Sequence, residues 1–146
     1  MADAKPILLI AEDNKLIADV LQKVFSRKFD VRSYEKGEDA IKALQDIGRP
    51  VVMLTDNGLE GSMTGFDLIE QARALHPDMP AVMLSGYVSP EGQQKLQALN
   101  VPLVNKPALP IDIEPLLEAA LRKLEGGRTP IQHAIRPRDK DGRGPA

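Results

Sequence analysis

Four short apolar runs alternate with helical patterns along this chain, and this alternation constrains the fold more than any other feature. The runs cover residues 7–11, 51–55, 81–84 and 101–104, and a polar or charged residue follows at or just past each end. Short, continuous apolar runs are typical of strands that are buried on both faces of a parallel sheet. Strands that alternate with helices form βαβ units. We therefore predict a doubly wound α/β fold.

The segments between the runs carry apolar residues at helical spacing. Behind Asn14, a plausible N-cap, a stripe is formed by Leu16, Ile17, Val20, Leu21, Val24 and Phe25. A short polar segment, residues 29–33, is the weakest of the expected strands and suits a sheet edge. A second helix carries Ala40, Ile41, Leu44 and Ile47 and should end at Gly48 and Pro50.

Three further helices are expected. One starts near Gly65 and ends before Pro77, and the last begins near Pro115 and is closed by Gly126 and Gly127. The helix around residues 91–99 contains Gly92 and several glutamines, so we expect the lowest local stability there.

Composition restricts the class of protein. A chain of 146 residues with 42% hydrophobic and 27% charged residues is sufficient for one domain, which we place at residues 1–125. The chain has no cysteine, which excludes disulfides, thiolate metal sites and cysteine nucleophiles. No run approaches the roughly 18 apolar residues of a membrane span, and no cleavable leader is visible, so we expect a soluble cytoplasmic protein.

The last 21 residues, 126–146, differ from the rest of the chain. They hold five basic and two acidic residues, a net charge of +3, among prolines and glycines, so we expect a disordered tail. The tail has no aromatic residues interleaved with its arginines, and the whole chain has a net charge of −2. We therefore do not expect nucleic-acid binding.

Polar side chains follow the four apolar runs. They are Glu12 with Asp13, then Asp56, Ser85 and Lys106. Ligands bind beyond the carboxyl ends of the strands in open parallel sheets, so these side chains should meet there. Three carboxylates in one place favour a divalent cation with oxygen ligands. Each residue alone has an ordinary interpretation as a helix-start charge, a turn former or a solvated lysine, and the ordered set carries the prediction.

This ordered set, Glu12-Asp13, Asp56, Ser85-Gly86 and Lys106-Pro107, resembles the receiver domain of two-component response regulators over about residues 5–125. The resemblance implies a flavodoxin-like five-stranded parallel sheet, in strand order 2-1-3-4-5, with five flanking helices. It also implies that Asp56 is a phosphorylatable aspartate.

Phosphoryl transfer to a carboxylate needs positive charge, because one anion attacks another. We assign Asp13, Asp56 and the Gly58 carbonyl as direct ligands of Mg²⁺, with Glu12 acting through water. Lys106 and the Ser85 hydroxyl are expected to contact phosphoryl oxygens.

The chain departs from the receiver pattern in two places. Leu103 stands where receivers often carry an aromatic switch residue, and we therefore expect Ser85, Tyr87 and the weak helix behind them to carry the switch. After Asp56, Glu60 replaces a usual proline and Gly65 comes one position late, so the loop is one residue longer than usual. This change brings metal affinity into question.

The leading functional hypothesis is a stand-alone response regulator, not an enzyme beyond its own phosphorylation and dephosphorylation chemistry. Its partners would be a histidine kinase or histidine phosphotransfer protein and a downstream target. The resemblance also points to the surface of the fourth and fifth helices as a homodimer face. The alternatives are a phosphorylation-independent adaptor and a phosphate sink. A metal-dependent phosphohydrolase is disfavoured, because no second aspartate follows two residues after Asp56 and no general acid is evident.

Overall fold

The computed structural model describes residues 5–59, 61 and 63–127. The predicted disordered tail therefore lies outside the described residues from position 128 onward. None of the helices within the described ranges is both long enough and apolar enough to cross a bilayer.

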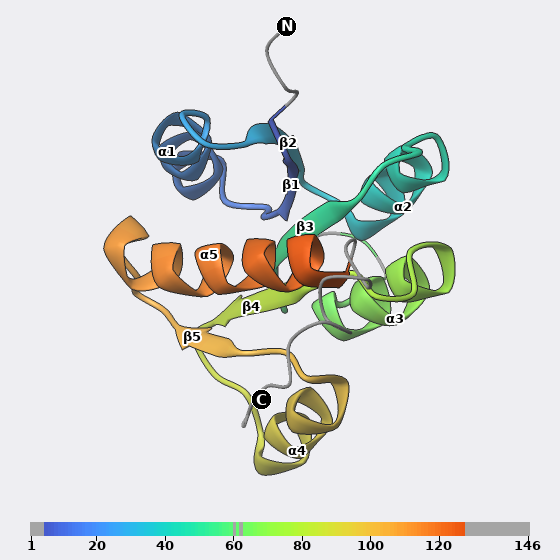
Figure 1. The fold of residues 1–146 in the computed structure, drawn as a ribbon. Helices are drawn as coiled ribbons and strands as arrows, with labels where there is room; N and C mark the ends of the chain where they lie inside the picture. The colour runs from blue at the N-terminus through green and yellow to red at the C-terminus, as the bar shows by residue number, and fades with distance from the viewer. Residues whose placement is uncertain (1–4, 60, 62, 128–146) are drawn as a thin grey trace, which may run out of the picture.

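Five parallel strands and five helices alternate along the chain, as Figure 1 shows. The strands pair in the order β2-β1-β3-β4-β5, and every pairing is parallel. This confirms the predicted doubly wound sheet. The elements are β1 (Ile7–Ala11), α1 (Lys15–Phe25), β2 (Asp30–Tyr34), α2 (Gly37–Gln45), β3 (Val51–Asp56), α3 (Gly65–Leu75), β4 (Ala81–Ser85), α4 (Pro90–Leu99), β5 (Leu103–Asn105) and α5 (Pro110–Gly127).

Helices cover both faces of the sheet because successive strand residues point to opposite sides. Along β1, Leu9 packs in a cluster with residues of α2, α3 and α4, whereas Leu8 and Ile10 pack with α1 and α5. Figure 1 shows α1 and α5 on one side of the sheet and α2 and α3 on the other. The inner strands β1, β3 and β4 are buried along their whole length, which explains their uninterrupted apolar sequences.

Several predicted boundaries were wrong. α5 begins at Pro110 instead of near Pro115, because Pro110 occupies the first helical position, where its missing N–H costs nothing, while Pro115 lies inside the helix. Gly126 and Gly127, predicted to close this helix, are its last two residues.

The fifth strand and the second helix are also shorter than predicted. Val101 does not start β5, because its N–H donates to the Leu96 carbonyl at 2.9 Å and so completes the end of α4. α2 ends at Gln45, and Ile47 lies beyond it. The amides of Asp46 and Ile47 bond carbonyls only three residues back, which tightens and terminates the helix.

The apolar stripe of α1 divides between core and solvent. Leu21 and Phe25 are buried, whereas Leu16, Val20 and Val24 are 78%, 50% and 41% exposed. The exposed three lie four residues apart, so they form a line along one side of the helix. The apolar stripe therefore has a buried part and an exposed part, although its sequence pattern indicated a single buried face.

Candidate functional site

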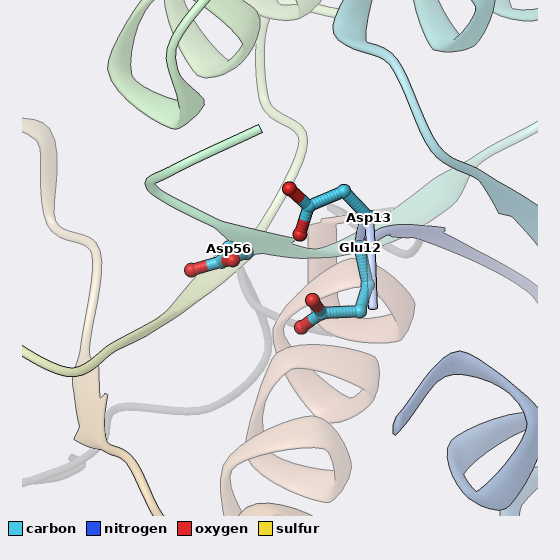
Figure 2. Close-up of side chains that lie close together, drawn as sticks. All are labelled: Glu12, Asp13 and Asp56. Carbon is cyan, nitrogen blue, oxygen red and sulfur yellow. The ribbon is translucent and has the colours of Figure 1, made fainter. Parts of the chain in front are cut away.

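Three carboxylates meet at the carboxyl ends of two adjacent strands, as Figure 2 shows. Asp56 is the last residue of β3, and Glu12 and Asp13 follow the last residue of the neighbouring β1. One oxygen from each of the three lies within 4.8 Å of the others, a spacing that suits a shared metal ion. The parallel pairing of β1 with β3 brings these residues together across 43 positions of sequence.

Lys106 follows the edge strand β5, and its side chain reaches this cluster. Its Nζ lies 3.0 Å from Glu12 Oε1 and 3.1 Å from Asp56 Oδ2. β4 separates β5 from β3 in the sheet, and the long lysine side chain spans that strand. The Lys106 amide donates to the Ser85 carbonyl at 2.9 Å, and the Lys106-Pro107 peptide bond is cis. The predicted lysine thus contacts two of the three predicted carboxylates.

Burial sets the electrostatics of the cluster. Glu12 and Asp56 are 1% and 7% exposed. Burial raises the pKa of Glu12, although the Asn14 amide and the Lys106 ammonium oppose that effect. Burial alone would lower the pKa of Lys106, but hydrogen bonds to Glu12 and Asp56 outweigh it and raise that pKa. Because one ammonium group faces three carboxyl groups, the site can accept a further cation.

Ser85 lies at the end of β4, as predicted, and it is buried. Its Oγ donates to the Tyr87 carbonyl at 2.9 Å and accepts from the Tyr87 amide at 3.3 Å. The hydroxyl is therefore engaged by its own loop, and it must leave the Tyr87 carbonyl before it can donate elsewhere. Tyr87, the second predicted switch residue, is 74% exposed.

Three residues that the sequence did not single out for the site lie against or next to the Asp56 backbone. The Thr55 hydroxyl donates to the Asp56 carbonyl at 2.8 Å. Gly65 packs so closely that an added Cβ would lie 2.4 Å from the same carbonyl oxygen. The Asn57 Oδ1 is buried without a hydrogen-bond partner among the described residues. Gly58, the predicted backbone ligand, follows Asn57 and is exposed, between two partly buried residues.

A family model for the response regulator receiver domain matches residues 8–119. The chain belongs to this family. The matched residues contain every side chain that we predicted for the site. The receiver resemblance drawn from the sequence is thereby confirmed.

Curated relatives of this receiver domain are longer proteins. The chain is 31% identical over 126 residues to the transcriptional regulatory protein CreB of Escherichia coli K12, and the aligned region covers 83% of this chain and 53% of CreB. The chain is 21% identical over 98 residues to the sensor kinase CckA of Brucella abortus, and the aligned region covers 67% of this chain and 10% of CckA. The receiver domain thus spans about half of one relative and a tenth of the other.

Solved structures share the fold of this receiver domain. A CheY-like receiver domain protein from Methanospirillum hungatei aligns with a TM-score of 0.76 at 23% identity, over 86% of this chain and 99% of that one. The chemotaxis protein CheY4 of Vibrio cholerae aligns with a TM-score of 0.67 at 22% identity, over 83% of this chain and 99% of that one. At this level of identity the likeness concerns the fold alone.

Proposed function

We propose that this receiver domain accepts a phosphoryl group on Asp56 from a histidine kinase or a histidine phosphotransfer protein, and that it signals by changed binding of a target protein. The observation that carries the proposal is the meeting of Asp56 with Glu12, Asp13 and the Lys106 ammonium at one edge of the sheet. Family membership supplies the chemical context.

In the proposed step, a carboxylate oxygen of Asp56 forms a bond to phosphorus while the bond between phosphorus and the donor's imidazole nitrogen breaks. The imidazole leaves with the electron pair, and the product is an acyl phosphate. Lys106 already lies 3.1 Å from Asp56 Oδ2, so its charge can compensate the incoming phosphoryl oxygens. The Ser85 hydroxyl could donate to a second oxygen after releasing the Tyr87 carbonyl.

The donor set fits Mg²⁺, which prefers oxygen ligands and retains several waters. Asp13 and Asp56 would hold the ion directly with the Gly58 carbonyl, and Glu12 would act through water. Bound there, the ion would neutralise negative charge on the transferring phosphoryl group. We propose that this self-modification and its reversal by water are the domain's only enzymatic chemistry. We also propose that the protein is cytoplasmic.

Exposed apolar side chains around the site support a protein donor. Leu16 follows the site on α1, and Leu109 and Ile111 follow Lys106 with exposures of 66% and 72%. A partner that covers these residues would bring its phosphohistidine over Asp56 and would bury apolar surface while doing so.

The surface predicted for homodimers has a different character. Within the described residues, no exposed large apolar side chain lies on α4 or β5. On α5, Ile111 is exposed, so a homodimer on that face would combine polar contacts with this apolar side chain.

Two alternatives use the same fold. In a phosphorylation-independent adaptor, partner binding would be the same with and without beryllofluoride, a mimic of the bound phosphoryl group. In a phosphate sink, phosphorylation would occur without any change in partner binding. The engagement of Ser85 by the Tyr87 backbone favours the switch, because a phosphoryl group competes directly for that hydroxyl.

The test is incubation with Mg²⁺ and either acetyl phosphate or a phosphorylated histidine phosphotransfer protein, followed by intact mass measurement. We expect one added phosphoryl group, absent in Asp56→Asn. Absence of the group with every donor, together with absence of Mg²⁺ binding, would overturn the proposal in favour of the adaptor.

A further inference from the structure

We propose that the state of Asp56 is transmitted to the N-terminus of α2 through the contact between Met63 and Gly37. This inference rests on the proposed phosphorylation of Asp56, and it assigns a second route beside the loop of Ser85 and Tyr87. It concerns the loop at residues 57–64, the part of the chain that departs most from the receiver pattern.

Both ends of this loop are fixed next to the phosphoacceptor. The Asn57 amide donates to the Leu84 carbonyl at 3.2 Å, and the Gly65 amide donates to the Asn57 carbonyl at 2.9 Å. A Cβ at Gly65 would lie 2.4 Å from the Asp56 oxygen, so the start of α3 presses directly on the Asp56 backbone. A displacement at Asp56 has little room to be absorbed at either end.

The described residues in the middle of the loop, Gly58, Leu59, Gly61 and Met63, differ from its ends. Among the described residues, no backbone hydrogen bond ties Gly58, Leu59, Gly61 or Met63 to the sheet. Leu59 and Met63 pack against the edge of the core cluster that includes Ala40 and Leu44 of α2. Movement generated near Asp56 is therefore passed to this middle part and on to its packing partners.

Two close contacts join the middle of the loop to the first turn of α2. A Cβ at Gly37 would lie 2.7 Å from Met63 Sδ, so the methionine occupies the space of the missing side chain. Gly61 has φ of +93°, and a Cβ there would lie 3.0 Å from the Glu38 Oε1. A shift of the loop therefore changes the packing of the Met63 and Glu38 side chains against the first turn of α2.

The first turn of α2 is the more compliant partner. Lys36, its N-cap residue, makes no side-chain capping hydrogen bond, whereas Asn14, Thr64 and Ser89 cap α1, α3 and α4. Because a side-chain cap stabilises a helix start, the start of α2 relies instead on a backbone β-bridge at Lys36, on the acidic residues of its first turn and on packing, including that of Met63. A shift of Met63 should therefore change the order of residues 36–39.

The experiment follows the Met63 methyl group and the backbone amides by NMR during addition of beryllofluoride and Mg²⁺ to the full chain. We expect shifts at Met63 and at residues 37–39 as well as at residues 85–88. In Gly37→Ala and in Met63→Ala, the response at residues 38 and 39 should be lost while that at residues 85–88 persists. Two variants are used because they remove the contact from opposite sides, and Met63→Ala adds no atom to α2.

Gly48→Ala is the matched control, since a Cβ at Gly48 meets nothing within 4 Å, and it should keep the full response. Shifts at residues 85–88 without any at Met63 or residues 37–39 would overturn the α2 route and leave the proposed function standing. A response at residues 38 and 39 that survives both contact variants would overturn it as well. No shift anywhere, with no phosphoryl group added by mass, would overturn the proposed function itself.

Discussion

At the scale of single residues, the site depends on one lysine that serves two buried carboxylates. Lys106 contacts both Glu12 and Asp56, and Glu12 is only 1% exposed. A buried carboxylate whose partner is removed bears its desolvation cost alone. Lys106 therefore stabilises the resting site as well as serving the proposed transfer.

We predict that Lys106→Ala lowers the free energy of unfolding by about 1–3 kcal/mol at neutral pH without Mg²⁺, as measured by urea denaturation. Lys95→Ala is the control, because the Lys95 and Glu70 side chains are 3.4 Å apart and each is 47% exposed. That exposed pair should contribute no more than about 1 kcal/mol. Equal losses in the two variants would contradict a special role for Lys106.

At the scale of elements, the edge strand β2 is held at its start by an ion cluster. Asp30 lies 2.9 Å from Arg32 and 3.3 Å from Arg49, and Arg49 also donates to the Lys5 carbonyl at 2.8 Å. In the sequence, Asp30 and Arg32 contribute to the polar character that predicted a weak strand. In the fold, Asp30 joins the strand to Arg49, which lies just before β3, and Arg32 pairs with Asp30 within β2.

This cluster has a defined pH dependence. The hydrogen bond from Arg32 lowers the pKa of Asp30 below its ordinary value of 3.8, against a smaller opposing effect of burial. The ionised form is thus favoured by folding, so its contribution is complete above pH 3.8 and is lost as the pH falls through the lowered pKa. We expect Asp30→Asn to flatten the acid side of a plot of urea midpoint against pH. Asp19→Asn, at an exposed aspartate of α1, should leave that slope unchanged, and an identical slope in all three proteins would refute the prediction.

α4 is attached to the domain by few contacts, some apolar and some polar. Leu96 is its one buried residue among those described. Arg73 of α3 donates to the Met79 and Leu99 carbonyls, and Lys95 lies 5.4 Å from the centroid of the Phe66 ring. The sequence-based expectation of low local stability in α4 stays a prediction, and hydrogen exchange tests it.

We predict that the amides of α4 exchange faster than those of the buried strands, and that Arg73→Met accelerates them further. Loss of hydrogen bonds from a charged donor should reduce local stability by about 1.5–3 kcal/mol, which is a tenfold or greater increase in exchange. Arg122→Met, at an exposed position of α5, serves as control. Unchanged protection of α4 in Arg73→Met would show that its apolar anchor suffices.

At the scale of the whole molecule, the exposed side chains of Leu16 at the start of α1, Leu109 just before α5 and Ile111 at the start of α5 lie toward the end of the sheet that holds Asp56. Leu75, also exposed at 42%, lies at the end of α3, at the opposite edge of the sheet. The apolar side chains that we propose for partner docking therefore lie apart from Leu75.

We predict that Leu16→Gln slows phosphoryl transfer from a protein donor by about fivefold or more, equivalent to about 1 kcal/mol of lost apolar burial. Phosphorylation by acetyl phosphate should be unaffected, because a small donor does not need the α1 surface. Leu75→Gln should change neither rate. If Leu16→Gln slows both donors equally, the substitution acts on the site and not on docking.

The sequence by itself determined the doubly wound parallel sheet and the residues at the ends of its strands, because buried parallel strands require continuous apolar runs and their carboxyl ends must share one edge. Glu12, Asp13, Asp56 and Lys106 were identifiable for that reason. The strand order was predicted from the resemblance to receiver domains, and the structure confirms it. The tertiary structure decided what local patterns do not encode. It placed Leu16, Val20 and Val24 in solvent, because packing decides which side of a helix is covered by the sheet. It also placed Met63 over Gly37, a contact between distant segments whose only sequence sign is a glycine where a side chain would not fit.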